Sequence, residues 1–477
     1  MAASGIRVDH DLLGEAEIPA DVYWGVHTLR AIENFPITGT PISHYPDLIV
    51  ALADIKAAAA RTNCSLGLLP PDLAGAIVEA AHEIRSGRLH DQFVVDVIQG
   101  GAGTSTNMNA NEVIANRALE LLGRTRGDHL HLHPNTHVNM SQSTNDVYPT
   151  ALKLAAHAGV ARLIEAMAHL REAFRRKSEE FADVLKMGRT QLQDAVPMTL
   201  GQEFSTYVVM LDEDMARLRE ASSLIREINL GATAIGTGIN APAGYAERVC
   251  DELRAISGIP VVTAPNLIEA TQDCGAFVQL SGVVKRVAVK VSKVCNDLRL
   301  LSSGPRAGLG EINLPVRQAG SSIMPGKVNP VIPEVVNQIA FEAIGNDLTV
   351  TMAAEAGQLQ LNAFEPIIAH SLFKSVSHLR GGCLILADRC VSGITANRDR
   401  LATTVRESIG VATALNPHIG YAAATEVAVA AHDSGRNVAE LVLERGLMTA
   451  EQLEQILLPE NLAHPYRREM ASRRDAE

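Results

Sequence analysis

The chain has 477 residues, a formal net charge of -12 at pH 7, and a composition that is 47% hydrophobic but only 4% aromatic. This length exceeds one compact core and predicts two or three domains, while the abundance of aliphatic side chains indicates a mainly α fold. The negative charge argues against a nucleic-acid partner, because no basic stripe is available to neutralise a phosphate backbone.

Nothing in the sequence indicates a membrane segment or a secretory leader. No apolar run reaches the roughly 18 residues needed to span a bilayer, and residues 1–7 lack the apolar core of a signal peptide. The six cysteines show no C-x-x-C spacing, so we interpret them as free, mostly buried thiols in a reducing compartment. We therefore expect a cytoplasmic protein without a membrane partner.

The two ends of the chain differ in pattern from its middle. Residues 1–140 are predicted to form a mixed, mostly helical domain, with turn-rich segments such as 36–41. Residues 396–477 are predicted to form a small helical domain, because their short helical patterns are separated by Asn416-Pro417 and Pro459-Glu460.

The central part, residues 141–395, is predicted to hold five long helices that pack as a bundle. Apolar residues recur at spacings of three and four from Phe277 to Leu301, a seam typical of coiled-coil-like packing. The same pattern runs through 160–174 and through 204–225, the latter after a start signal at Pro197. Further helices are expected over 334–348 and 367–388. Apolar seams on helices this long also favour packing between subunits.

The segment from Gly320 to Pro330 carries most of the functional information. Its sequence, GSSIMPGKVNP, holds two glycines, two prolines, two hydroxyls, the ammonium of Lys327 and the amide of Asn329. No helix or strand accommodates this mixture, so we predict a loop. Donors, a cation and hinge glycines suit a loop that closes over a small anionic substrate. No G-x-S-x-G pattern surrounds Ser321, which argues against a hydrolase triad.

Three other segments collect small polar residues, and we expect each to lie beside a helix boundary: 101–109, 141–146 and 188–193. Hydroxyls and free backbone N–H groups at helix starts bind carboxylates. Plain helix capping is the alternative for any one of these segments. With all four segments and Lys327 in one chain, we favour an anion-binding site.

The spacing of these segments predicts an oligomer. A helical stretch of roughly residues 150–186 separates Thr144 from Thr190, and at 1.5 Å per residue it is on the order of 50 Å long. If that helix is straight, the two threonines cannot share a pocket within one subunit. A site that uses both residues must then be assembled from different chains.

Three patterns are rejected as cofactor or metal motifs. Residues 320–327 have one residue too many for a phosphate loop and no Ser or Thr after the lysine. Residues 101–103 lack the third glycine of a dinucleotide fingerprint. The histidines at 131, 133 and 137 have no accompanying carboxylate pattern, so we prefer local hydrogen bonding to metal binding.

At these four segments the chain resembles the aspartase/fumarase superfamily, and the resemblance runs from Asp11 to Pro465. The 320–330 segment is similar to the hallmark loop of that superfamily, and the other three segments fall at its other active-site segments in order. Within the superfamily, residues 23–35 and 186–194 resemble the aspartase branch.

One position separates that branch from the class II fumarases. Fumarases carry a histidine that helps to activate water where this chain has Gln191, which cannot act as an acid or base. Glu334 is similar to the carboxylate that pairs with that histidine. Thr136 replaces an aspartate and Met140 replaces a lysine, both of which are common in the superfamily. These two changes affect whether a second anion site is present in this segment.

The resemblance implies a lyase that converts L-aspartate, a small dicarboxylate, reversibly to fumarate and ammonia without a metal or organic cofactor. It also implies a homotetramer whose active sites are shared between chains. Removal of the Cβ proton creates an enediolate, which needs preorganised donors. Ser321 is similar to the general base, and Lys327 with loop backbone N–H groups would promote its ionisation. The other implied contacts are Thr104, Ser143, Thr144 and Ser322 for the β-carboxylate, Thr190, Lys327 and Asn329 for the α-carboxylate, and Asn145 and Gln191 for the amino group.

Two other functions stay open at this point. The first is fumarate hydration by a class II fumarase, and the second is an inactive helical scaffold that retained the fold. For Ser321 itself, the alternative to a catalytic role is a hydroxyl that stabilises a turn.

Overall fold

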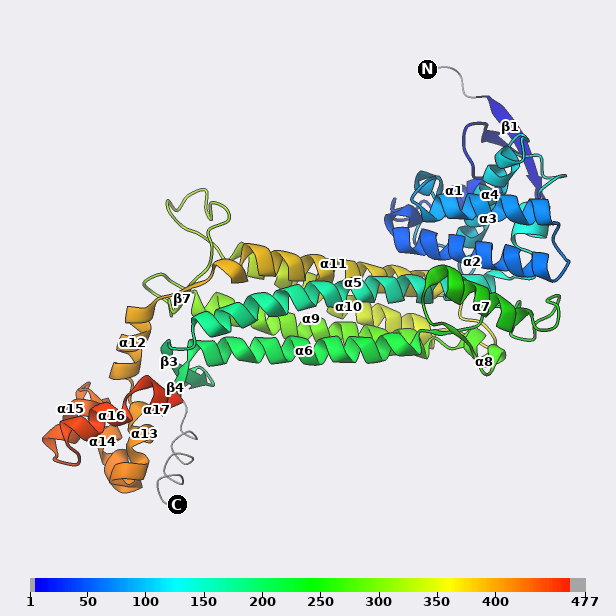
Figure 1. The fold of residues 1–477 in the computed structure, drawn as a ribbon. Coiled ribbons are helices and arrows are strands. Elements are labelled where there is room, and N and C mark those ends of the chain that lie inside the picture. The colour runs from blue at the N-terminus through cyan, green and yellow to red at the C-terminus, as the bar shows by residue number, and fades with distance from the viewer. Residues whose placement is uncertain (1–4, 464–477) are drawn as a thin grey trace. The chain divides into compact units, whose positions relative to one another are not determined.

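The computed structural model describes residues 5–463, and its fold is mainly α (Figure 1), as the composition predicted. The described sheets have two strands each: β1 (Ile6–Asp11) with β2 (Gly14–Pro19), β3 (Leu185–Thr190) with β4 (Gln193–Thr199), β5 (Glu227–Ile228) with β6 (Val262–Thr263), and β7 (Ile312–Asn313) with β8 (Thr395–Ala396). All pair antiparallel except β5 and β6. No helix in residues 5–463 combines the length and the apolar character needed to cross a membrane.

Two compact units divide the chain. The first comprises residues 1–164, 216–288 and 339–380, and the second comprises 165–215, 289–338 and 381–477. The five predicted long helices are present, and each has residues in both units: α5 (Thr144–Glu180), α6 (Leu200–Leu224), α9 (Gly275–Leu301), α10 (Val331–Glu355) and α11 (Glu365–Arg389). The three-domain division and the assembly of these helices into one bundle stay predictions from the sequence.

The first unit also contains the shorter helices that precede and follow α5. They are α1 (Val26–Asn34), α2 (Pro46–Ser65), α3 (Pro71–Arg85), α4 (Thr104–Leu121), α7 (Tyr245–Ser257) and α8 (Leu267–Gln272). The alanine-rich α2 packs against α3, α4 and α7, and the run Ala57–Ala60 is buried on every side. Small side chains allow this close approach of four helices, because they take up little space between the backbones.

A buried carboxylate fixes the start of α1. Glu112 on α4 accepts hydrogen bonds from the backbone N–H groups of Gly25 (2.8 Å), His27 (2.8 Å) and Thr28 (3.2 Å), and from the Thr28 hydroxyl (2.7 Å). Helix α1 has no capping side chain of its own. Glu112 therefore satisfies N–H groups that a helix start leaves without partners, and it joins α1 to α4.

The second unit ends in a small helical cluster. It contains α12 (Arg398–Glu407), α13 (Val411–Ile419), α14 (Tyr421–Ser434), α15 (Val438–Glu444), α16 (Ala450–Ile456) and α17 (Pro459–Ala463). Leu415, Val427 and Val442 are fully buried at the centre of this cluster. Elsewhere in the same unit, the rings of Phe174 on α5 and Tyr207 on α6 pack edge to face, with centroids 5.2 Å apart.

Three predicted helix boundaries were wrong, and one of them is Asn416-Pro417, which lies inside α13 instead of separating two helices. Helix α5 begins at Thr144 and includes Pro149, and it ends at Glu180, where the sequence had predicted a helix over roughly 150–186. A proline inside a helix leaves the carbonyl four residues earlier without its N–H donor. Here that carbonyl belongs to Asn145, and the side-chain amide of Asn229 donates to it at 3.0 Å. The tertiary contact therefore removes part of the penalty that made Pro149 look like a boundary.

The third correction concerns Pro197, which lies in β4 and not at a helix start. Helix α6 begins at Leu200, after a reciprocal cap: the Gln202 N–H donates to Thr199 Oγ1 (3.0 Å), and the Thr199 N–H donates to Gln202 Oε1 (2.9 Å). Proline is tolerated in β4 because the sheet has only two strands, so every strand has an outer edge that needs no donor.

Candidate functional site

In the first unit, two helix starts carrying expected site residues lie against each other. Thr104 is the first residue of α4, and Thr144 is the first residue of α5. The side-chain amide of Asn107, three residues after Thr104, donates to Thr144 Oγ1 at 3.2 Å. Gly103 permits this approach: its φ is +87°, and a Cβ there would lie 2.4 Å from the Tyr148 ring. The segments 101–109 and 141–146 therefore form one polar cluster.

The hydroxyls of this cluster differ in what they offer a ligand. Thr104 Oγ1 donates to the Gly101 carbonyl at 2.8 Å. Ser143 Oγ accepts from the Asn145 N–H at 3.2 Å, and Thr144 Oγ1 accepts from Asn107, but neither hydroxyl donates to another residue of the described chain. Two O–H donors at the start of a 37-residue helix suit a carboxylate, because the helix dipole also favours negative charge there.

The glycine-rich segment 231–244 belongs to this cluster, although the sequence interpretation missed it. Ala234 O accepts from the Asn145 amide at 2.7 Å. The N–H groups of Gly231 (3.1 Å) and Thr233 (2.8 Å) donate to the buried carboxylate of Asp146. Four glycines in this segment have positive φ, at 231, 236, 238 and 244. Their spacing in the sequence is a signal from which a tight, shaped loop could have been predicted.

A fully buried lysine lies behind the cluster. Lys56 on α2 donates to Asn139 Oδ1 (2.9 Å) and Gln142 Oε1 (2.8 Å). Asn139 Oδ1 also accepts from the amide of Asn107 at 3.1 Å. Burial lowers the pKa of Lys56 from its ordinary 10.5 to about 7. Lys56 therefore holds the loop before α5 through the same amide group that contacts Asn107.

We expect Lys56 to make the protein more stable as the pH rises from about 7 towards 10.5. In this window the unfolded chain carries a proton on Lys56 that the folded chain has lost. Folding therefore releases this proton, and the free-energy cost of that release falls as the pH rises. The thermal midpoint measured against pH checks this, and Lys56→Met should lack this part of the rise. The exposed Lys293 is the control, since Lys293→Met should retain it. Equal slopes in all three proteins would contradict the prediction.

The segment 188–193 lies at a β-hairpin and not beside a helix boundary, which corrects the expectation from the sequence. Gln191 (φ +54°) and Leu192 (φ +63°) form the two-residue turn between β3 and β4. Thr190 and Gln191 are exposed at this tip. The hairpin therefore presents both expected site residues to solvent in the second unit.

Buried charges hold the base of this hairpin. Lys186 Nζ lies 2.6 Å from Glu203 Oε2 and 2.8 Å from Glu311 Oε2, and Arg189 also pairs with Glu311. The side chains of Lys186 and Glu311 are 2% and 3% exposed. Glu311 directly precedes β7, nine residues before the 320–330 loop begins. These ion pairs join the hairpin to the segment that leads into the loop.

The 320–330 segment is a loop, as predicted. Its two ends are tied together, because the Gly320 N–H donates to Lys327 O and the Asn329 amide donates to Gly320 O, each at 2.8 Å. Ser321 Oγ accepts from the N–H groups of Ile323 (3.1 Å) and Met324 (2.9 Å). Ser322 and the ammonium of Lys327 are exposed, and Lys327 Nζ has no hydrogen bond or ion pair within the described chain.

Two backbone donors on one serine oxygen stabilise a negative charge on that oxygen. The same contacts also stabilise the turn, which was the alternative interpretation of Ser321.

The expected site residues fall into two groups. Thr104, Ser143, Thr144 and Asn145 belong to the first unit, and Thr190, Gln191, Ser321, Ser322, Lys327 and Asn329 belong to the second.

The histidine cluster makes local hydrogen bonds. His133 Nδ1 accepts from the N–H groups of Asn135 (3.0 Å) and Thr136 (3.3 Å), and His137 Nδ1 accepts from the His133 N–H at 2.8 Å. Burial lowers the pKa of both imidazoles. Across residues 5–463, no group of three or more His, Cys, Asp or Glu side chains is arranged to hold a metal ion. All six cysteines are free, and all but Cys64 are buried.

Comparison with known proteins gives concordant results. A family model described as lyase matches residues 14–345, and one described as fumarase C C-terminus matches residues 411–464. An aspartate ammonia-lyase from Pseudomonas aeruginosa is 59% identical, with 96% of this chain and 97% of that protein covered. An aspartate ammonia-lyase from Escherichia coli K12 is 54% identical, with 97% of each covered.

Two solved structures extend the comparison. A fumarate lyase:delta crystallin from Brucella melitensis, bound to cobalt, is 56% identical, with a TM-score of 0.93 and with 96% of this chain and 99% of that chain covered. A class II fumarase from Schistosoma mansoni is 36% identical, with a TM-score of 0.92 and with 97% and 100% covered. The fold is therefore shared with a class II fumarase, and the sequence identity is higher to the ammonia-lyases.

Proposed function

Because the chain belongs to the aspartase/fumarase superfamily of lyases, we propose that it catalyses the reversible, non-oxidative deamination of L-aspartate to fumarate and ammonia. The identity of 54–59% to aspartate ammonia-lyases over nearly the whole chain carries this conclusion. Gln191 supports the choice between branches, since an amide at the hairpin tip can hydrogen-bond to an amino group but cannot take a proton from water.

In the proposed reaction, the Ser321 oxygen removes a proton from Cβ of aspartate. The electron pair moves into the β-carboxylate and forms an enediolate, which then expels ammonia from Cα to give fumarate. Ser143 and Thr144 supply O–H donors to the developing charge, together with Ser322 and with Thr104, whose hydroxyl turns from the Gly101 carbonyl to the substrate. Thr190, Lys327 and Asn329 hold the α-carboxylate, while Asn145 and Gln191 face the amino group.

We propose that each site is shared between chains of a homotetramer. Two observations support this arrangement. Helix α5 has 37 residues, about 55 Å at the usual rise, and Thr144 is its first residue while Thr190 follows its end. On α10, Phe341, Leu348 and Met352 are 60–64% exposed at spacings of seven and four, an apolar stripe that suits packing against a second copy.

A cytoplasmic location stays a prediction, supported by the free thiols.

The activity is tested by following ultraviolet absorbance of fumarate with purified protein and L-aspartate, with L-malate as a parallel substrate. Fumarate from aspartate alone is expected. Fumarate from malate alone would mean that Gln191 does not prevent hydratase chemistry and that the protein is a fumarase. No product from either substrate would support the inactive scaffold.

Sharing of sites predicts complementation between two inactive variants. Thr144→Ala and Ser321→Ala chains should each be inactive, and when they are unfolded together and reassembled in equal amounts, activity should return. If each site takes one residue from each of two chains, about a quarter of the sites in a random mixture contain both native residues. Each variant reassembled alone is the control. A mixture that stays inactive while forming normal tetramers would contradict the proposal.

A further inference from the structure

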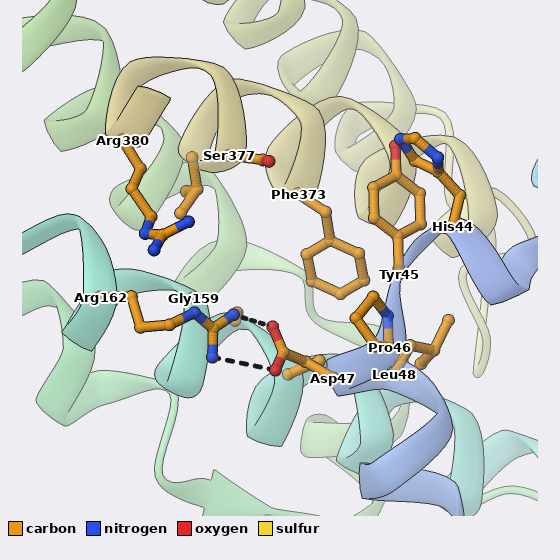
Figure 2. Close-up of a pocket in the computed structure, with 13 residues that line it drawn as sticks. His44, Tyr45, Pro46, Asp47, Leu48, Gly159, Arg162, Phe373, Ser377 and Arg380 are labelled. Carbon is orange, nitrogen blue, oxygen red and sulfur yellow. Dashed lines mark hydrogen bonds and ion pairs between the residues drawn. The ribbon is translucent and has the colours of Figure 1, made fainter. Parts of the chain in front are cut away.

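A cavity of about 360 Å³ lies within the first unit, and none of its lining residues belongs to the proposed active site. Figure 2 shows its lining, which comes from the chain entering α2 and the first residues of that helix (44–48), from α5 (155–162) and from α11 (373–380). A volume of this size is in the range of small-molecule binding sites. All three segments belong to the same unit, so the cavity is a feature of that unit alone.

Apolar groups make up most of the cavity wall. Leu48, Ala155, Ala156, Phe373 and Val376 line it, and all five are buried in the surrounding packing. Gly159 keeps the space open, because a Cβ built at this position would already lie 3.4 Å from Val376 Cγ1. A longer side chain at 159 would therefore occupy the cavity. This wall suits an apolar body, whose burial removes it from water.

Three charged side chains also line the cavity. Arg162 forms a two-pronged ion pair with Asp47, with Nη1 and Oδ1 3.0 Å apart, so its charge is balanced within the protein. Arg380 lines the same cavity, and its guanidinium has no hydrogen bond or ion pair with any residue of the described chain. In Figure 2 the two arginines lie toward one end of the view and Tyr45 toward the other. These three charges sum to one positive charge.

Tyr45 is already satisfied, since its hydroxyl lies 2.8 Å from Nδ1 of His370. Arg380 is thus the charged group left to recognise a ligand, and a guanidinium pairs best with a carboxylate through two parallel hydrogen bonds. A second negative charge on the ligand would meet the carboxylate of Asp47. We propose that this cavity binds a small monocarboxylate with an apolar body, with its carboxylate on Arg380 and its body against Phe373 and Val376.

The test uses the full-length assembled protein and 3-phenylpropionate as the probe, in calorimetric titrations with saturating fumarate present to fill the proposed active site. Saturable binding is expected. The neutral amide of the same acid and the dianion succinate should each bind at least about tenfold more weakly, because one lacks the charge and the other adds a charge beside Asp47.

Two variants assign the binding to this cavity. Arg380→Gln should weaken binding of 3-phenylpropionate about tenfold by removing the cation, and Gly159→Leu should abolish it by filling the space. Arg248→Gln, which changes an exposed arginine on α7 away from the cavity, is the matched control and should bind like the unaltered protein. If Gly159→Leu does not fold, Arg380→Gln decides alone.

The proposal is overturned by three results: no saturable binding of the probe, binding that Arg380→Gln leaves unchanged, or binding that fumarate displaces. The last result would place the probe in the active site. None of these outcomes bears on the deamination activity, which the aspartate and malate assays test separately.

Discussion

Ser321→Ala is expected to lower kcat for fumarate formation from L-aspartate by roughly 10²–10⁴-fold, the range typical of lost general-base catalysis, while KM changes little. Ser321 Oγ accepts two backbone hydrogen bonds, from Ile323 and Met324. Both bonds strengthen when the oxygen carries a negative charge, so they lower the cost of ionising a hydroxyl that is otherwise a weak acid. Initial rates across a range of aspartate concentrations separate kcat from KM.

The control must distinguish a base from a turn-stabilising hydroxyl. Ser434 also accepts a backbone N–H, from Arg436 at 3.3 Å, and it lies far along the chain from the loop. Ser434→Ala should retain normal turnover. If Ser321→Ala lost activity and thermal stability together, with KM raised as much as kcat is lowered, the hydroxyl would act by shaping the loop. Normal turnover in Ser321→Ala would rule out its role as the base.

Glu311→Gln is expected to destabilise the protein by about 3 kcal/mol, because it leaves the buried ammonium of Lys186 with one fewer counter-charge. Lys186 and Arg189 are balanced in the native state by Glu203 and Glu311. The thermal midpoint should fall by about 3 °C. Since these pairs hold the base of the β3–β4 hairpin, the KM for aspartate should rise as Thr190 and Gln191 lose their fixed position.

The matched control is Glu454→Gln. Glu454 is an exposed carboxylate on α16 without a partner in the described chain, so this variant should melt like the unaltered protein. A second variant separates charge balance from general damage. Adding Lys186→Met to Glu311→Gln removes the unbalanced cation, so the double variant should be more stable than the sum of the two single effects predicts. Simple additivity, or an unchanged midpoint in Glu311→Gln, would contradict the proposed role of the pair.

Local patterns predicted the long helices well and their ends poorly. The seam from Phe277 to Leu301 matches α9, because the spacing of three and four leaves one apolar face that has to be buried. The start of α5 was misplaced, since the amide of Asn229, 80 residues away in the chain, removes part of the penalty of Pro149. Pro197 was misread as a helix start because a two-stranded sheet also accepts proline at an edge.

The sequence by itself determined the mainly α fold class, the long helices, the loop at 320–330 and the superfamily, since periodicity, turn-forming residues and local motifs are properties of neighbouring residues. Only the tertiary structure decided which distant groups meet. Asn107 reaches Thr144, Lys56 reaches Asn139, and Glu311 reaches Lys186. These contacts depend on how helices and hairpins pack, and a charged or amide side chain carries no local sign of the partner it will find.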